Sequence, residues 1–388
     1  MGIDSGCRPS LAFVFAAALL VVGSASARTP APTTGTTPAA TAVDTAATTA
    51  PATSPCSGPS VTLRGATSTP YSSSVGGGTT FGLYGWYSTG VGGGRGNKGF
   101  SASTDGADLC VVGGIVDGDI PSSWDWRQVH TFGGAGYTTA VNAGIAYLDN
   151  VRVDDVEDGW HPRERPYPTN KGVMHMKRAY MTSIHDDCIE NDHFMSGTIE
   201  DSLFDGAFTF LSEQNQNSLT NTMGSDEDPH IYLKNVYVRL SQINAPGSYT
   251  VGRWFKWQPY GATNHDLDIT DSVFAVDRAP TNKKGNVQWD PNLSFPPGTT
   301  FHGTNYILWL GSGPYGGQKP SGVTFLEGQA AKDKWVQVRN DWLASHCYPI
   351  PSRAFGYAPS PRDIGYEDDP VVPPGPTCQE LTPSAHDP

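Results

Sequence analysis

The chain of 388 residues is short of positive charge and has only one long apolar run. It contains 25 Lys and Arg against 38 Asp and Glu, a net charge of −13, which disfavours general binding to nucleic acid or to an anionic membrane. The apolar run, Leu11–Val22, is too short to span a bilayer. We therefore expect no nucleic-acid partner and, once the N-terminal segment is removed, no membrane partner.

The N-terminal segment has the features of a signal peptide. Arg8 precedes the apolar run, and Ala25-Ser26-Ala27 supplies a small-residue cleavage pattern. This predicts a signal peptide over residues 1–27 and a secreted protein, extracellular or periplasmic. Residues 28–59 are rich in Ala, Thr and Pro and are predicted to be a flexible linker, and 351–388 a Pro-rich tail. One folded domain, 60–350, remains, and we expect it to be monomeric.

The composition also argues against helical architectures. The chain has 45 Gly and 31 Pro, about a fifth of its residues, which interrupt long helices. Its 16 Tyr, 10 Trp and 15 Phe are sufficient for a large core. The expected class is all-β, with irregular N-terminal coils and a short C-terminal cap that includes a helix-permitting run over Gln329–His346.

Cysteine is scarce, and its number is informative. Cys7 lies in the predicted signal peptide, which leaves five cysteines, an odd number for an oxidising compartment. Cys188 lies within an apolar and acidic motif and is predicted to be free and buried. The predicted disulfides join Cys56 to Cys110 and Cys347 to Cys378.

Short strand-like segments recur through the middle of the chain. Each has an aliphatic residue, a turn-forming residue and then alternating apolar positions. The copies are LDNVRV (148–153), IEDSLF (199–204), LKNVYV (233–238), ITDSVF (269–274) and the weaker MKRAYM (176–181). A unit this short must stack on others to bury its inner face. A β-sandwich or jelly roll is the alternative, but its strands recur at closer and more even intervals.

Stacking the copies by their strand motifs groups several acids. An offset of 28 residues places Asp158 on Asp186, and a shorter turn brings Asp205 to the same place on the next coil, about 4.8 Å apart per coil. Asp187 and Glu190 lie nearby. Carboxylates so close repel one another, so either one of them has a raised pKa, as acid/base catalysis requires, or a cation binds between them. Alternatively, each Asp only satisfies backbone donors at a turn.

The repeats and the acids together resemble known proteins. The stacked units are similar to the coils of right-handed parallel β-helices, the fold of pectin-degrading enzymes, and Asp186-Asp187-Cys188-Ile189 resembles the Asp-Asp-Cys-aliphatic motif of polygalacturonases. That resemblance implies inverting hydrolysis of a polysaccharide, with Asp158 or Asp155 as a third aspartate. We expect Asp186 or Asp187 to be the general acid and Asp158 or Asp205 the base, with no cofactor required. His185 precedes the paired aspartates and is a further candidate.

Two other functions fit the same residues. A Ca²⁺-dependent lyase, similar to β-helix pectate lyases, would bind the ion and remove a proton with Lys256 or Arg253. Its predicted metal ligands are Asp186, Asp187, Asp205 and Glu190. A non-catalytic glycan-binding or adhesin-like module is the third possibility. In each case the predicted substrate-binding residues are Arg253, Lys256, Trp160, Trp254 and Trp257, since sugar faces stack on aromatic rings.

Overall fold

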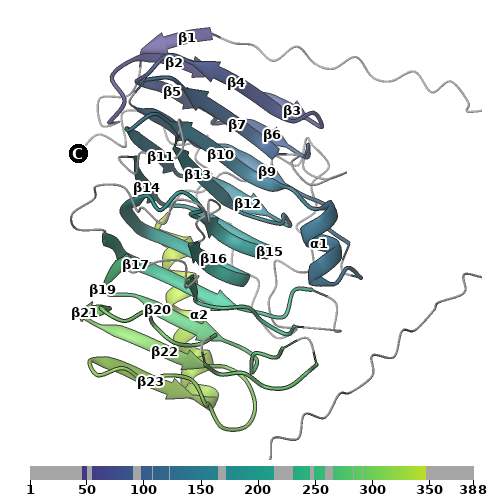
Figure 1. Ribbon diagram of the computed structural model, residues 1–388, viewed down its shortest axis with the longest axis vertical. Helices are drawn as coiled ribbons and strands as arrows, with labels where there is room; N and C mark the ends of the chain where they lie inside the picture. The colour runs from purple at the N-terminus through teal and green to yellow at the C-terminus, as the bar shows by residue number, and fades with distance from the viewer. Residues whose placement is uncertain are drawn as a thin grey trace, which may run out of the picture. The chain divides into compact units, whose positions relative to one another are not determined.

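The part of the chain that the structure describes is mostly β-strand (Figure 1). The structure is a computed structural model that describes residues 46–49, 55–90, 98–106, 108–121, 123–164, 172–213, 230–244, 249–257, 265–282, 284–290 and 292–346. These residues form 23 strands and two helices. The all-β prediction is confirmed at this level. Within these ranges, no helix has both the length and the apolar character needed to cross a bilayer.

The strands pair in three parallel ladders. Each strand from β2 to β12 pairs with the strand that comes third after it in the chain. The first ladder contains β2 (Pro59–Thr62), β5 (Thr79–Gly82), β8 (Leu109–Val112), β11 (Ile145–Asp149), β14 (Val173–Lys177), the first residues of β16 (Ser196–Glu213) and β17 (His230–Leu240), β19 (Asp266–Thr270) and β21 (Thr300–His302). A strand β1 (Ala46–Thr49) pairs antiparallel with β2 at its start.

The second and third ladders follow the first in each repeat of the chain. The second contains β3 (Gly65–Thr67), β6 (Trp86–Ser88), β9 (Ile115–Asp117), β12 (Arg152–Asp154), the first residues of β15 (Tyr180–Glu190), the middle of β16, the end of β17, β20 (Val273–Val276), β22 (Asn305–Trp309) and β23 (Val323–Glu327). The third contains β4 (Tyr71–Val75), β7 (Lys98–Thr104), β10 (Ala135–Val141), β13 (Trp160–Glu164), the ends of β15 and β16, and β18 (Phe255–Trp257).

The sequence repeats mark the corner between the first and second ladders. The first residues of the five copies occupy successive places in the first ladder. They are Leu148, Met176, Ile199, Leu233 and Ile269. The turn-forming residue of every copy has a left-handed backbone with φ near +50°: Asn150, Arg178, Asp201, Asn235 and Asp271. Asn and Asp tolerate this conformation better than other residues with a side chain. The repeat therefore encodes a corner, and the predicted stacking of its copies is confirmed.

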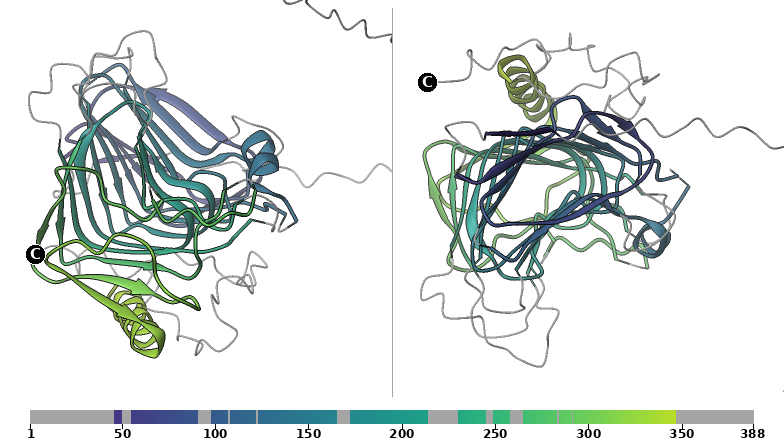
Figure 2. Two further views of the ribbon diagram at one scale, coloured as in Figure 1. Left: turned by 60° about the horizontal axis from the view of Figure 1, so that its bottom comes forward. Right: turned by 90° about the horizontal axis from the view of Figure 1, so that it is seen from above.

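The core lies between the three ladders. One cluster of buried residues draws Phe81 and Leu148 from the first ladder, Val153 and Phe204 from the second, and Trp160 from the third. Alternation within strands explains this placement: in β14, Met174 and Met176 are buried while the intervening residues are partly exposed. The view along the stack shows the strands of the ladders surrounding this interior (Figure 2).

Two helices lie against the strands. The helix α1 (Trp126–Phe132) begins at Asp125, whose side chain accepts hydrogen bonds from the backbone N–H groups of Arg127 and Gln128. The helix α2 (Gly328–Ser345) confirms the helix-permitting run and packs over the second ladder. There Trp335 and Trp342 contact the apolar outer side chains of that ladder, and both helices are visible in Figure 1.

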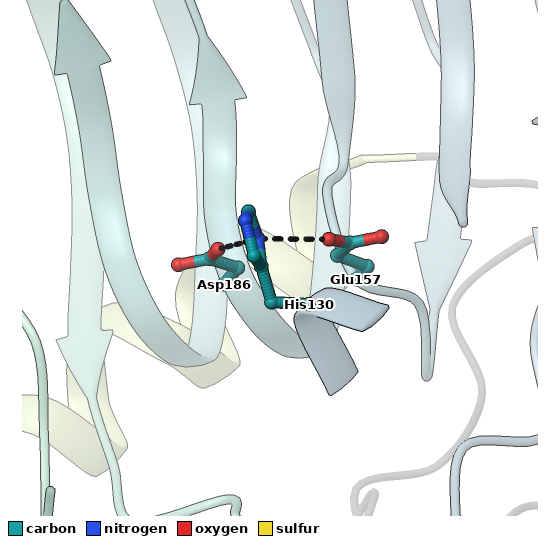
Figure 3. A group of neighbouring side chains, drawn as sticks. All are labelled: His130, Glu157 and Asp186. Atoms are coloured by element: carbon teal, nitrogen blue, oxygen red, sulfur yellow. Dashed lines mark ion pairs between the residues drawn. The ribbon is translucent and has the colours of Figure 1, made fainter. Parts of the chain in front are cut away.

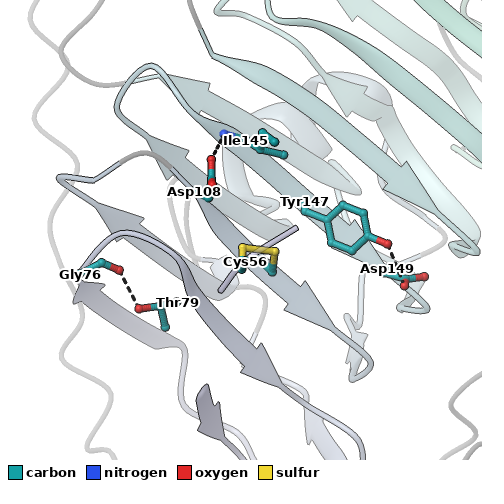
Figure 4. The surroundings of a disulfide bond; sticks show 8 residues. Cys56, Gly76, Thr79, Asp108, Ile145, Tyr147 and Asp149 are labelled. Carbon is teal, nitrogen blue, oxygen red and sulfur yellow. Dashed lines mark hydrogen bonds between the residues drawn. A yellow bond between two sulfur atoms is a disulfide. The ribbon is translucent and has the colours of Figure 1, made fainter. Parts of the chain in front are cut away.

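A disulfide joins Cys56 to Cys110, as predicted (Figure 4). Among the described residues, Cys188 is the free cysteine and is buried, which is also as predicted. The second predicted pair, Cys347 and Cys378, lies outside the described residues. Both Cys56 and the strand β1 fall within residues 28–59, so part of the range predicted to be a flexible linker has a defined structure.

Candidate functional site

The acidic residues gather at the corner between the second and third ladders. Three positions with a positive φ form this corner on successive repeats: Asp155, Ser183 and Gly206. The segment between β12 and β13 supplies Glu157 and Asp158, and the middle of β15 supplies Asp186 and Asp187. The β15–β16 register shifts between Ile184 and Asp187. Such an irregularity changes the direction in which side chains point, and here it accompanies two consecutive acids that both face Asp158.

Asp158, Asp186 and Asp187 form a compact group of three carboxylates. One oxygen from each lies within 4.8 Å of the others, and the residues are only 6%, 3% and 1% exposed. The backbone N–H of Asp187 donates to Asp158 Oδ1 at 3.1 Å. We call these three residues the acid cluster. The structure thus brings together three of the four residues predicted to be catalytic acids and bases.

Lys256, from β18, places an ammonium group against the acid cluster. Its Nζ lies 2.8 Å from Asp187 Oδ2 and 4.0 Å from Asp186 Oδ1. Burial lowers the pKa of Lys256, but the neighbouring carboxylates outweigh burial and raise it overall. Burial raises the pKa of Asp187 to about 7, with Lys256 opposing and Asp186 adding to the shift. Among the described residues, Asp187 Oδ1 has no hydrogen-bond partner although it is buried.

A histidine links the acid cluster to Glu190. His161 Nε2 lies 3.0 Å from Asp158 Oδ2 and contacts Glu190 Oε2. Burial lowers the pKa of His161, but the two acids raise it to about 10. Burial raises the pKa of Glu190, but His161 lowers it to about 2. Burial and Glu190 raise the pKa of Asp158 well above its ordinary value, with His161 opposing the shift. His161 and Glu190 form an imidazolium–carboxylate pair beside it.

Arg163 provides one contact that conflicts with this charge assignment. Its Nη2 lies 3.0 Å from His161 Nδ1, and only a neutral imidazole has an acceptor there. The two acids at the other ring nitrogen favour the imidazolium. The acids outweigh this contact, because Arg163 is partly exposed and solvent screens its charge.

The helix α1 covers the other side of Asp186. Trp126 Nε1 donates to Asp186 Oδ1 at 2.9 Å, and the Trp126 ring stacks on His130 with centroids 5.1 Å apart. His130 Nδ1 lies 3.3 Å from Glu157 Oε1 and 3.4 Å from Asp186 Oδ2, between the two carboxylates (Figure 3). The sequence did not indicate these partners: Trp126 and His130 have the spacing of one helical turn, but nothing local places that turn beside residue 186.

His185 belongs to a separate group next to the acid cluster. Its Nε2 lies 2.7 Å from Asp155 Oδ1 and its Nδ1 lies 2.8 Å from Asn244 Oδ1. The amide nitrogen of Asn244 donates to the backbone oxygen of His185, which fixes the amide orientation. Both ring nitrogens therefore face acceptors. The side chain holds the corner in place rather than facing the acid cluster.

Asp205 does not join the acid cluster, so the predicted column of Asp158, Asp186 and Asp205 is wrong. Asp205 pairs with Thr182, and its carboxylate binds Arg239 Nε at 2.5 Å and Arg339 Nε at 2.6 Å. Burial raises the pKa of Asp205, but the two guanidinium groups lower it overall. The metal set that included Asp205 is therefore not assembled. Asp205 instead attaches α2 to the second ladder.

Two predicted sugar-stacking residues are part of the core. Trp160 and Trp254 are fully buried, so neither ring is available to a glycan. Trp160 pairs with Ile189 of β15. Arg253 and Trp257 are partly exposed. Of the predicted substrate-binding residues, Lys256 lies on the acid cluster.

Comparison with family models, with curated proteins and with solved structures finds no match to this chain. The resemblance to polygalacturonases and pectate lyases therefore has no support beyond the residues that suggested it. What supports a function for the site is the arrangement of its carboxylates, histidines and Lys256.

Proposed function

We propose that the three ladders are the faces of a right-handed parallel β-helix. The supporting observation is that each strand from β2 to β12 pairs with the third one after it along the chain, which is how a solenoid of three-strand coils is connected. The left-handed residues at equivalent positions of successive repeats fit the corners of such coils. The acid cluster would then lie at one corner, across neighbouring coils.

We further propose that the chain is a secreted glycoside hydrolase that acts on a polysaccharide. The acid cluster is the observation that carries this proposal, because hydrolysis of a glycosidic bond needs one protonated carboxylic acid and one ionised carboxylate close together. The disulfide supports secretion, since such bonds persist in oxidising compartments. Hydrolysis of this kind needs no cofactor.

Within the acid cluster, the proposed roles follow from the hydrogen bonds. Asp187 Oδ1 is buried without a donor in the described part of the chain, so it is the oxygen best suited to carry a proton to a leaving group. Asp186 accepts a hydrogen bond from Trp126 and is the proposed carboxylate. A substrate must displace Lys256 or Trp126, because all three aspartates are almost fully buried.

The contacts and burial of the acid cluster also bear on the two alternative functions, a lyase and a glycan-binding module. In a lyase, Lys256 would have to be neutral to remove a proton, yet its ammonium group is paired with Asp186 and Asp187. This disfavours elimination with Lys256 as the base. A glycan-binding or adhesin-like module is the second candidate, and the burial of the acid cluster favours it, since buried acids can be purely structural.

A panel of polysaccharides separates these functions. Hydrolysis releases reducing ends without an unsaturated product, elimination gives ultraviolet absorbance that a chelator abolishes, and a module retains glycan without cleaving it. We expect reducing ends, and a decrease of about 10²- to 10⁴-fold in Asp187→Asn. The control is Asp333→Asn, at an exposed position on α2. Unchanged cleavage in folded Asp187→Asn would overturn the acid-cluster mechanism.

A further inference from the structure

His130, Glu157 and Asp186 form a second group of potential ligands beside the acid cluster. Each offers one atom within 4.8 Å of the other two. Figure 3 shows the imidazole between the two carboxylates, with His130 from α1, Glu157 from the segment before β13, and Asp186 from β15. The three residues come from separate parts of the chain, so the group depends on the fold rather than on a local turn.

The distances in this group suit an ion better than hydrogen bonds. His130 Nδ1 lies 3.3 Å from Glu157 Oε1 and 3.4 Å from Asp186 Oδ2, whereas a charge-assisted N–H···O bond is normally about 2.7–2.9 Å long. Two ligands that bind one Zn²⁺ tetrahedrally, with bonds of about 2.0–2.2 Å, are separated by about 3.4 Å. The distance from the nitrogen to each oxygen therefore equals the distance between two ligand atoms of one tetrahedral metal ion.

The charge of the group also requires compensation. Glu157 is 5% exposed and Asp186 is 3% exposed, and burying a carboxylate is costly unless a positive charge balances it. In the ranges that the structure describes, the ion pairs place one basic side chain, His130, against Glu157, and an imidazole is positively charged only when it is protonated. Lys256 is nearer to Asp187 than to Asp186. A single imidazole thus faces two buried carboxylates.

The surroundings hold the proposed ligands in orientation. Trp126 Nε1 binds Asp186 Oδ1, which leaves Oδ2 directed at His130; hydrogen bonds of this kind commonly orient metal ligands. Gly133, at the end of α1, lies so close to Glu157 that a Cβ there would be 2.7 Å from the Glu157 Cβ. The absence of a side chain at residue 133 lets Glu157 approach the helix that carries His130.

We propose that His130, Glu157 and Asp186 bind one divalent transition-metal ion, for which Zn²⁺ is the probe. An imidazole nitrogen with two carboxylates suits such an ion, whereas Ca²⁺ takes six to eight oxygen ligands. The proposed ion site differs from the Ca²⁺ set predicted from the sequence. The His130 side chain is partly exposed, although its Nδ1 atom is buried against the two carboxylates. Binding of the ion does not depend on the proposed hydrolase activity.

Metal binding to the purified chain tests the proposal directly. The chain is stripped with a chelator, dialysed and titrated with Zn²⁺ by calorimetry, and its metal content is then measured by mass spectrometry. We expect one equivalent of Zn²⁺ in the wild type and at least a tenfold weaker affinity in both His130→Ala and Glu157→Gln. The control is His302→Ala, which alters an exposed histidine that also faces a carboxylate, Asp268.

The binding results distinguish failure of the ion site from failure of the proposed hydrolase. Absence of an equivalent of Zn²⁺ in the wild type, or an affinity unchanged in either site variant, overturns the proposal. A loss in His302→Ala equal to that in His130→Ala does the same. Circular dichroism without metal confirms that the variants fold. A chain that binds Zn²⁺ and cleaves no glycan overturns the hydrolase alone, whereas one that cleaves glycan without binding Zn²⁺ overturns the ion site alone.

Discussion

Asp117, at the end of β9, has a carboxyl group in an unfavourable position for its negative charge. Burial raises the pKa of Asp117 to about 6, and Asp154, its partner on β12, adds to the shift. Tyr87 OH donates to Asp117 Oδ2 at 2.8 Å and opposes it. Below about pH 4 the carboxyl group is protonated in both folded and unfolded chains. Between about pH 4 and pH 6 the unfolded chain loses its proton first, so the folded state loses stability as the pH rises.

Asp117→Asn should therefore stabilise the protein at neutral pH. A shift from about 4 to 6 corresponds to about 2–3 kcal/mol, and because the side chain is partly exposed we expect about 1–2 kcal/mol. The gain should be present at pH 7.5 and absent at pH 3.5, as measured by urea unfolding at the two pH values. Asp105→Asn, at an exposed position, is the control. A gain that is equal at both pH values would contradict the titration of Asp117.

At the residue scale, the sequence predicted the site in part. Asp186 and Asp187 are adjacent, and the repeat offset brought Asp158 to them, so their grouping could be predicted from spacing. Asp205 is misplaced by the shorter turn assumed for its coil: the offset of 23 residues between MKRAYM and IEDSLF continues along the second ladder, where Asp205 pairs with Thr182 before the β15–β16 register shifts. His130 could not be found either, since a long-range contact between a short helix and β15 has no local sequence pattern.

At the element scale, the left-handed corner residues determine where each strand turns. Asn235 has φ +52° between the two parts of β17. A β-branched residue is strained in this conformation by about 1–2 kcal/mol, whereas Gly adopts it freely. We expect Asn235→Val to lower the free energy of unfolding by that amount and Asn235→Gly to change it little. Urea unfolding measures both variants.

A control separates the corner from the side chain itself. Lys234→Val introduces the same side chain one residue earlier, at an exposed strand position, where β-branched residues are favourable. It should be neutral or slightly stabilising. If Lys234→Val and Asn235→Val lower the stability equally, the left-handed corner is not the cause.

The attachment of α2 to the second ladder depends on the buried group of Asp205, Arg239 and Arg339. Asp205→Asn keeps the shape of the side chain but removes the carboxylate that lies between two buried guanidinium groups, and Arg239 keeps its longer contact with Asp277 at 3.8 Å. Breaking a buried ion pair in this way costs about 3–5 kcal/mol. We expect a loss of that size in thermal or urea unfolding, with glycan cleavage retained in the folded fraction. Loss of cleavage in fully folded Asp205→Asn would restore Asp205 as a catalytic candidate.

At the scale of the whole molecule, repetition was the informative part of the sequence. The Asn and Asp of the repeats marked the corners because few other residues with a side chain tolerate a positive φ, and the aliphatic positions marked the core. The third ladder was not visible as a repeat. Its strands β10 and β13 follow connections of different length. The burial of Trp160 depends on strands from other repeats, so the sequence alone did not distinguish it from a sugar-binding residue.

The Cys56–Cys110 disulfide is expected to stabilise the N-terminal end of the three ladders. Cys56 precedes β2, and Cys110 lies in β8. The two residues are 54 positions apart in the sequence, and the six strands β2 to β7 lie between them. Strands at the end of a stack have neighbours on one side only, so a link that limits the unfolded chain has a large effect there. The double variant Cys56→Ser, Cys110→Ser should lose about 2–4 kcal/mol of unfolding free energy. When both are unfolded in reductant, the wild type and the double variant should have the same stability, because reduction removes any other disulfide from both. Equal stability of the two without reductant would show that strand packing alone fixes this end.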